Sequence, residues 1–447
     1  MIKLLNRVLM GVVNRVGKVG PAFIKELLVY IPFKYRYGSA YTNFEKLIVK
    51  SHSWNEDELN TYIIQHFNTI FQYSKKFKLY QDKYEKSGVM NLEITSIDDI
   101  KKVPILTREE VQLSIADFNG YEIAKTGGTT GNPLHIYLDE NVWAREWAHY
   151  HYIWGKLGYK FTDTNFIFRE VNNQDEFLKF DFNHNTYIVN IYKIHSITVE
   201  EIKQFFKILT QKNVKYFHGY PSAINDFLRE IEDKVTNEQS EILQKQIECC
   251  FFSSEYPTPQ IVKYIQEVWN LDFVSCYGHT ETCVLAAADK NNLAFKPLHT
   301  YGFVEIEDGK LLGTSFHNFD MPLIRYNTND IAIPKYFSNG ILESFEIKEG
   351  RNFYYIIDKK NIRISIIDII DKMHPEIFDH VQYIQMYQET KGEATILVSQ
   401  KKSTEVDLIP LMNLKNLNLE IDFSLMFLEK PIKTMSGKVS LRVQKLP

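Results

Sequence analysis

Apolar residues recur at helical spacing in the first part of the chain. Between residues 55 and 90 they stand three or four positions apart, which places them on one face of an α-helix. The members of this face are Leu59, Tyr62, Ile63, Phe67, Ile70 and Phe71. Thr107 and Glu110 have the spacing of a capping box, which predicts that another helix begins there. Residues 141–157 carry the pattern of a further helix.

From residue 166 onward, short apolar runs alternate with segments of helical spacing. The predicted buried strands are 166–168, 187–191, 216–218, 250–252 and 273–274, and the predicted helices are 199–209, 223–231 and 261–269. Strands that alternate with helices imply parallel pairing with crossover helices. Between Gly302 and Ile333 the runs are short and divided by turns, which predicts an antiparallel β region. The pattern as a whole predicts an α/β protein.

Composition and length narrow this picture. At 447 residues the chain is expected to form more than one domain, and the predicted boundary is Gly350-Arg351, with a small α/β domain beyond it. A net charge of −4 argues against a general nucleic-acid-binding protein. The four cysteines, Cys249, Cys250, Cys276 and Cys283, form no Cys-x-x-Cys pair. This usage favours a reducing, cytoplasmic compartment and predicts that the cysteines serve packing.

The N-terminal segment, residues 1–37, is basic and amphipathic. On a helix over residues 2–18, four basic side chains fall within about 120° of one another, and apolar residues fill the opposite side. The basic residues are Lys3, Arg7, Arg15 and Lys18. Two interpretations remain open: the helix docks on the protein's own core, or residues 1–18 make peripheral contact with an anionic membrane at its inner face. No stretch reaches the roughly 18 uncharged apolar residues that a spanning helix needs.

A loop rich in glycine and threonine lies between two extended segments. Its residues are Thr126, Gly127, Gly128, Thr129, Thr130 and Gly131, followed by Asn132-Pro133. Backbone N–H groups and hydroxyls in such a loop can surround a phosphate, because glycine permits close approach of the backbone. The loop is not a Walker A motif, since it lacks the terminal Gly-Lys-Ser/Thr that opens a helix.

Three more motifs follow in order along the chain. Residues 275–281 read Ser-Cys-Tyr-Gly-His-Thr-Glu, residues 321–330 end in Asn-Thr-Asn-Asp, and residues 433–440 read Lys-Thr-Met-Ser-Gly-Lys-Val-Ser. Together with the glycine and threonine loop, this order resembles the adenylate-forming superfamily of acyl-CoA synthetases and related ligases. Within it, the chain is most similar to the phenylacetate–CoA ligase-like branch found with capsular and other surface-polysaccharide genes.

The resemblance implies a fold and a reaction. The fold would comprise a large N-terminal adenylate-forming domain (1–349) with parallel sheets and an antiparallel β region, and a small mobile α/β C-terminal lid (350–447). ATP and Mg²⁺ would activate a small carboxylic acid as an acyl-adenylate, with release of pyrophosphate. The acyl group would then pass to a thiol, as in CoA, or to the amine of a sugar or amino acid. Direct adenylyl transfer and a non-catalytic nucleotide-binding protein remain alternatives.

The resemblance also implies roles for single residues. Lys438 matches the lysine that contacts the carboxylate and the α-phosphate as charge develops, and Thr280 matches a donor to the α-phosphate. Glu281 matches the Mg²⁺ ligand, and hard cations do prefer oxygen ligands. The loop of residues 126–131 would hold the β- and γ-phosphates.

The remaining matches concern the nucleoside. Tyr277, beside Gly278, matches the tyrosine that stacks on adenine, and Asp330 and Arg351 match the groups that contact ribose. Ser254 and Glu255 match a segment that flanks the adenine and acyl pockets. Two departures from the family pattern are visible: Asn329 replaces the glycine before Asp330, and Arg351 is followed by Asn-Phe-Tyr-Tyr in place of an acidic hinge. Asparagine tolerates the left-handed backbone that such a glycine adopts.

Overall fold

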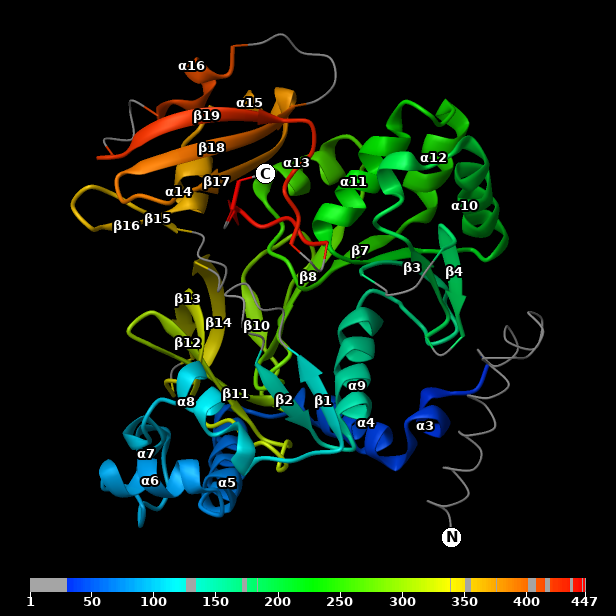
Figure 1. Ribbon diagram of the computed structural model, residues 1–447. Coiled ribbons are helices and arrows are strands. Elements are labelled where there is room, and N and C mark those ends of the chain that lie inside the picture. Colours follow the sequence, from blue (N-terminus) through cyan, green and yellow to red (C-terminus); the bar gives the residue numbers. More distant parts are fainter. Residues whose placement is uncertain are drawn as a thin grey trace.

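The computed structural model (Figure 1) describes most of the chain. The described ranges are 30–125, 134–170, 175–182, 184–337, 339–349, 355–374, 376–400, 407–414, 419–434, 437–443 and 445–446. Three predictions therefore lie outside the described residues: the amphipathic helix of residues 2–18, the phosphate loop of residues 126–131, and the boundary at Gly350-Arg351 with its ribose-contacting arginine.

Short helices make up one end of the molecule. They are α3 (Phe33–Arg36), α4 (Gly38–Ser51), α5 (Glu56–Ser74), α6 (Lys78–Lys86), α7 (Ile97–Lys102) and α8 (Arg108–Leu113), and the 3-10 turn η1 (Ile115–Asp117) follows. The capping box at the start of α8 is confirmed: the Glu110 N–H donates to the Thr107 hydroxyl and the Thr107 N–H to the Glu110 carboxylate. The segment predicted as helical over 55–90 is two helices. The chain turns between them because Tyr84 of α6 packs on Phe71 of α5.

The centre of the fold is a twelve-stranded sheet in the order β11-β12-β13-β14-β10-β9-β8-β7-β6-β3-β5-β4. Strands β3, β5, β6, β7 and β8 pair in parallel, and β4 closes that edge antiparallel. These strands are β3 (Asn165–Phe168), β4 (Leu178–Asp181), β5 (Thr186–Val189), β6 (Tyr216–Gly219), β7 (Cys249–Phe252) and β8 (Phe273–Gly278). The predicted parallel pairing is therefore confirmed.

Helices cover both faces of the parallel strands. Phe205 of α10 and Phe227 of α11 pack on one face, and Trp154 of α9 stacks on Phe251 at the other. The helices are α9 (Val142–Gly155), α10 (Val199–Gln211), α11 (Pro221–Glu232), α12 (Asn237–Gln246) and α13 (Pro259–Glu267), with a 3-10 turn η2 (Ile194–Ser196) before α10. All four cysteines of the chain are free and buried, as predicted.

The remaining strands of the large sheet are antiparallel, which confirms the prediction for residues 302–333 and adds strands on either side of that range. They are β9 (Leu285–Ala288), β10 (Phe295–Pro297), β11 (Gly302–Glu307), β12 (Lys310–Ser315), β13 (Tyr326–Tyr336) and β14 (Leu342–Glu349). Their buried side chains join those of α5 to α8 in one hydrophobic core. A separate hairpin of β1 (Glu122–Lys125) and β2 (His135–Leu138) flanks this core.

The described residues from 355 on, here called the C-terminal part, have a core of their own. A four-stranded sheet in the order β19-β18-β17-β20 is joined by a small hairpin and three short helices. The elements are β15 (Tyr355–Ile357), β16 (Arg363–Ser365), α14 (Ile366–Asp371), α15 (Ile377–His380), β17 (Val381–Tyr387), β18 (Glu393–Gln400), α16 (Ile409–Met412), β19 (Asp422–Leu428) and β20 (Arg442–Val443).

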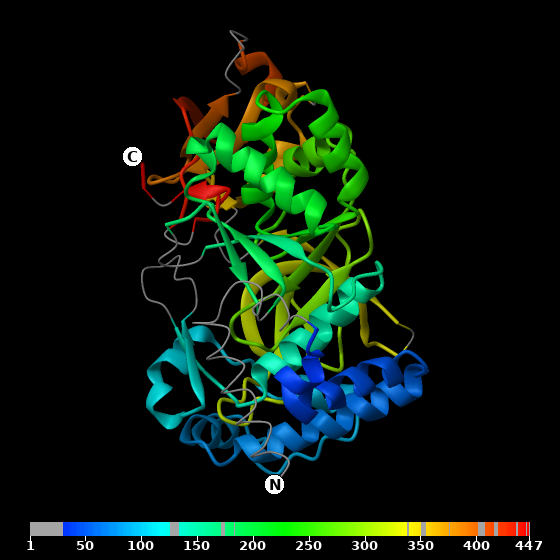
Figure 2. The same cartoon turned by 90° about the vertical axis from the view of Figure 1, so that its right-hand side faces the viewer.

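The C-terminal part lies against helices α11 and α13, at the opposite end of the molecule from α4 to α8 (Figures 1 and 2). In the described part of the chain, no helix combines the length and apolarity that crossing a bilayer requires. The architecture is the mixed α/β fold that the resemblance implies.

Candidate active site

The carboxyl ends of four parallel strands meet at one edge of the sheet. The pairing register aligns Phe168 of β3 with Gly219 of β6, Gly219 with Phe252 of β7, and Phe252 with Ser275 of β8. The residues that follow each strand therefore lie side by side, which is where open α/β sheets bind ligands. Gly219 has φ +131°, and a Cβ there would collide with the Phe168 carbonyl, so only glycine allows the chain to leave β6 at this point.

A turn near the C-terminus reaches this edge. Lys433 and Val439 form an isolated antiparallel bridge, and the Thr434 N–H donates to the Lys438 carbonyl at 2.8 Å. The Lys438 N–H in turn donates to the Thr434 hydroxyl at 3.1 Å. Lys438 Nζ donates to the Ser254 carbonyl at 3.2 Å and lies 5.2 Å from the centre of the Tyr220 ring. Ser254 follows β7 and Tyr220 follows β6, so the predicted catalytic lysine lies at the strand ends.

Two carboxylates act on the Lys438 ammonium through their charge. Burial lowers the pKa of Lys438, and the negative charges of Glu255 and Glu170 oppose that effect. Burial also raises the pKa of Glu255, although its oxygens accept hydrogen bonds from the Ser222 N–H at 3.2 Å and the Val439 N–H at 3.1 Å. The site thus holds a lysine whose charge depends on a neighbouring carboxylate. Glu255 contacts the backbone next to Lys438, a role that its sequence position does not reveal.

The predicted nucleoside residues come together in space. The Tyr277 hydroxyl donates to the Asp330 carboxylate, and the edges of Phe345 and His279 approach the Tyr277 ring. Asn329 has φ +61°, so the left-handed backbone expected at this position is confirmed. The Asp330 N–H donates to the Thr328 hydroxyl at 3.2 Å, which holds the backbone of this turn. An aromatic ring and a carboxylate side by side suit a nucleoside, one for the base and one for the ribose hydroxyls.

Glu281 is completely buried just beyond β8, next to the partly exposed Thr280. The Tyr326 hydroxyl donates to its Oε1 at 3.1 Å, Arg108 lies 3.9 Å away, and His279 Nδ1 lies 3.2 Å from its Oε2. Among the described residues, no three His, Cys, Asp or Glu side chains form a metal cage. A lone carboxylate nevertheless fits Mg²⁺, which commonly uses one or two carboxylates and takes its other ligands from phosphates and water.

Sequence reasoning missed a second group of charged residues beside Lys438. Asp226 of α11 lies within reach of Lys433 and Tyr383, both in the C-terminal part. The spacing of 207 residues between Asp226 and Lys433 carries no sequence signal of contact. The only available hint was a carboxylate among the apolar positions of α11, where Ala223, Phe227 and Leu228 are buried.

Solved structures provide the comparison, because no protein-family model and no curated protein matches the sequence. The chain is similar to 2-hydroxyisobutyryl-CoA ligase in the postadenylation state in complex with 2-HIB-AMP, with a TM-score of 0.63 and 14% identity over 87% of this chain and 90% of that one. It is also similar to the acyl acid amido synthetase GH3.15, with a TM-score of 0.51 and 13% identity over 83% and 87% of the two chains. At these identities the likeness shows the fold of adenylate-forming ligases.

The conformational state of the first ligase matters to the comparison. The same ligase in an open conformation, in complex with 2-HIB-AMP and CoA, gives a TM-score of 0.52 with 14% identity over 87% of this chain and 92% of that chain. The share of this chain that is covered is the same in both comparisons, so the two TM-scores differ with the conformation of the ligase. The present structure superimposes better on the ligase in the postadenylation state than on the ligase in the open conformation.

Proposed function

We propose that this protein is an ATP-dependent ligase that activates a small carboxylic acid as an acyl-adenylate. The observation that carries the proposal is the approach of Lys438 to the carboxyl ends of the parallel strands, in an arrangement similar to that of a postadenylation ligase. The proposal includes the division into a domain of residues 1–349 that binds ATP and acid, and a C-terminal lid of residues 350–447.

The chemistry explains why such residues are needed. A carboxylate oxygen attacks the α-phosphorus of ATP, the bond from that phosphorus to the bridging oxygen breaks, and pyrophosphate leaves with the electron pair. Two anions must approach each other, so the protein contributes positioning and charge neutralisation more than covalent chemistry. The Lys438 ammonium would neutralise charge on the carboxylate and α-phosphate oxygens, and Thr280 would donate a hydrogen bond to the α-phosphate.

Nucleotide binding would use the residues around Tyr277. The ring would stack on adenine beside Gly278, Asp330 would accept hydrogen bonds from the ribose hydroxyls, and Arg351 would contact the ribose as a donor. Ser254 and Glu255 would border the adenine and acyl pockets. The loop of residues 126–131 would hold the phosphates that leave.

Glu281 would be the protein ligand of Mg²⁺. When bound, the ion would supply positive charge that lowers the repulsion between the two reacting anions. In this role Tyr326 and Arg108 hold the Glu281 carboxylate in place, and His279 borders its second oxygen.

The second half-reaction would transfer the acyl group from AMP to a thiol or an amine. A thiol acceptor such as CoA and an amine acceptor such as an amino sugar or amino acid are both compatible with this fold, since the similar structures include a CoA ligase and an amido synthetase. Within this class we favour work on a surface polysaccharide, with residues 1–18 holding the enzyme near the inner face of the membrane.

An assay of pyrophosphate release across a panel of carboxylic acids tests the proposal. Release that depends on one acid, with the product trapped by hydroxylamine, supports acyl-adenylate formation. A stable adenylylated product would instead indicate direct adenylyl transfer. Absence of release with every acid, while ATP still binds, would indicate a non-catalytic nucleotide-binding protein and contradict the proposal.

A further inference from the structure

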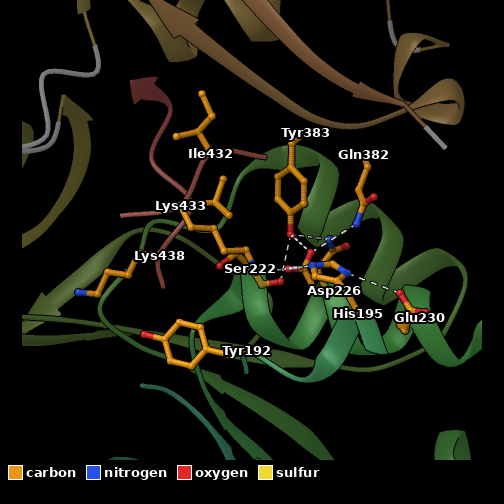
Figure 3. Close-up of polar contacts among 12 residues, drawn as sticks. Tyr192, His195, Ser222, Asp226, Glu230, Gln382, Tyr383, Ile432, Lys433 and Lys438 are labelled. Atoms are coloured by element: carbon orange, nitrogen blue, oxygen red, sulfur yellow. Dashed lines mark hydrogen bonds and ion pairs between the residues drawn. The ribbon is translucent and has the colours of Figure 1, made fainter. Parts of the chain in front are cut away.

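A buried carboxylate on α11 links the two parts of the chain. Asp226 is 1% exposed. Its Oδ2 lies 2.6 Å from Lys433 Nζ, and its Oδ1 accepts a hydrogen bond from the Tyr383 hydroxyl at 2.6 Å. Gln382 lies slightly farther away, with its amide nitrogen 3.3 Å from the same oxygen. Figure 3 shows these side chains converging on α11 from the C-terminal part, with Lys438 on the chain segment that follows Lys433.

Hydrogen bonds connect the segments that carry Lys433 and Tyr383. The side chain of Gln385, on the same strand β17 as Tyr383, bonds to both backbone groups of Ile432, at 2.8 and 2.9 Å. It also donates to the Ser440 carbonyl at 2.7 Å. One buried amide thus joins β17 to both ends of the turn that carries Lys438. A change in the position of Lys433 or Tyr383 is therefore expected to change the position of Lys438.

The turn is held at both ends by carboxylates from outside the C-terminal part. Asp226 binds Lys433 at its start, and Glu255 accepts the Val439 N–H at its end. Lys438 lies between these two anchors. Its ammonium contacts the Ser254 carbonyl and the Tyr220 ring. Its position relative to the strand ends follows from the two anchors.

We propose that Asp226 is a positioning residue that holds the Lys433–Val439 turn so that Lys438 reaches the strand ends during adenylation. The proposal rests on the proposed function, in which Lys438 acts on the α-phosphate. Asp226 itself touches neither the strand-end residues nor Lys438, and acts through Lys433 and Tyr383.

Asp226 also has a partner in its own part of the chain. His195 of η2 lies 3.5 Å from the Asp226 carboxylate and 3.5 Å from Glu230, and it belongs to the same part of the chain as Asp226. If the C-terminal part moves away, Asp226 keeps His195 and exchanges Lys433 and Tyr383 for water. The carboxylate therefore keeps a partner. A buried carboxylate without any partner would oppose the movement strongly.

A second ion pair between the same two parts supplies a matched control. Lys263 of α13 and Asp379 of α15 lie 3.4 Å apart, with side chains 37% and 61% exposed. Exposed pairs of this kind contribute little to stability, because water and salt screen them. Asp379→Asn therefore removes a charge from the same interface without disturbing the turn that carries Lys438.

The first test measures the position of the C-terminal part directly. Spin labels on the full chain at Glu238→Cys in α12 and Glu429→Cys after β19 report the distance between the parts, and the four buried native cysteines leave these two sites selectively labelled. We expect Asp226→Asn to broaden the distance distribution and Asp379→Asn to leave it as in the wild type. An unchanged distribution in Asp226→Asn would overturn the proposal, whether or not an acid substrate is known.

The second test separates the half-reactions. With the acid that gives most pyrophosphate release, Asp226→Asn should lower kcat for adenylation roughly 10- to 100-fold at unchanged KM for ATP, because misplaced groups lose rate in that range. Acyl transfer from chemically prepared acyl-adenylate should be unchanged. Lys433→Gln, which leaves Asp226 intact, should show the same loss in adenylation and the same unchanged acyl transfer. It replaces Asp226→Asn in this test if Asp226→Asn does not fold. Equal losses in both half-reactions would indicate a merely structural role and overturn the proposal.

Discussion

The Tyr277 hydroxyl donates a hydrogen bond to the carboxylate of Asp330, 53 residues farther along the chain. Tyr277 is the last residue but one of strand β8 and Asp330 lies in β13, two strands separated in the sheet by β9, β10 and β14. The curvature of the sheet brings them together. The bond fixes the ring and the carboxylate relative to each other before any ligand arrives, which reduces the ordering that nucleotide binding requires.

This bond leads to the first prediction. Tyr277→Phe keeps the ring and removes only the hydroxyl, so we expect KM for ATP to rise about 10-fold, the lower end of the loss of one hydrogen bond to a charged group. Asp330→Ala removes the acceptor for the ribose hydroxyls, and it should raise KM for ATP at least as much as Tyr277→Phe does. Titration of ATP against both variants checks the order. A larger effect from Tyr277→Phe would mean that the hydroxyl, and not the ring, contacts the nucleotide.

Lys438→Ala should cut acyl-adenylate formation by roughly 10²–10³-fold, the usual loss when one preorganised charge-stabilising donor is removed. ATP affinity should change little, because the ammonium acts on charge that develops in the transition state. Hydroxylamine trapping measures the rate, and equilibrium binding of ATP is the control. Adenylation at the wild-type rate would show that the lysine has another role.

Glu255→Gln should move the alkaline limb of the pH–rate profile to lower pH. Lys438 is active when charged, so the rate falls as pH rises through its pKa, which burial already lowers. The Glu255 charge raises that pKa, and its removal lets the pKa fall further. At low pH, where Glu255 in the wild type is protonated, the two profiles should converge. Glutamine keeps an acceptor oxygen for the Val439 N–H.

A profile that does not move would contradict this coupling between Glu255 and Lys438. A raised KM for ATP in Glu255→Gln would instead favour the contact with nucleotide that the family resemblance implies. ATP titration at neutral pH separates the two roles, since the coupling to Lys438 affects the rate and not the binding of the nucleotide.

Elements with a strong apolar pattern were predictable from the sequence. The face of α5 predicted from Tyr62, Ile63 and Phe67 is buried as a block. Helix α12 was not predicted, because Leu243 is its only buried residue, although Thr236 and Gln239 form a capping box that marks its start. The edge strand β4 was missed as well, since it is four residues long and only Leu178 is buried.

The candidate site was predictable only where its residues lie in local motifs. Lys438, Glu281 and Asp330 each stand in a motif that can be read along the chain, whereas the contact of Asp226 with Lys433 arises when distant elements pack together. Apart from its place among the apolar positions of α11, nothing local distinguishes Asp226 from a solvated helix carboxylate. Tertiary packing therefore supplies the second half of the site.

Deletion of residues 1–18 tests the two interpretations of the basic N-terminal segment. If the segment contacts membranes, the truncated protein should adenylate soluble acids normally but sediment less with vesicles that contain anionic lipid. Binding of the full-length protein should fall as salt rises, because salt screens the attraction. Neutral vesicles are the control. A full-length protein that ignores anionic vesicles, or a truncated one that aggregates, would support docking on the protein's own core.

Glu281→Gln tests the metal ligand. Glutamine keeps the size and the acceptor oxygen for the Tyr326 hydroxyl but removes the charge that would hold Mg²⁺ against the phosphates. We expect a higher Mg²⁺ requirement and a slower adenylation. Binding of AMP, which needs no metal, should be unchanged and shows that the site is intact.

The physical reason lies in the repulsion between the two reacting anions. A divalent cation between the phosphates lowers the barrier to attack by the substrate carboxylate, and a neutral amide binds that cation more weakly. Mg²⁺ titrations of adenylation by both proteins decide the matter. Superimposable curves would exclude Glu281 as the ligand, and its carboxylate would then serve Arg108, His279 and Tyr326 as a buried structural anchor.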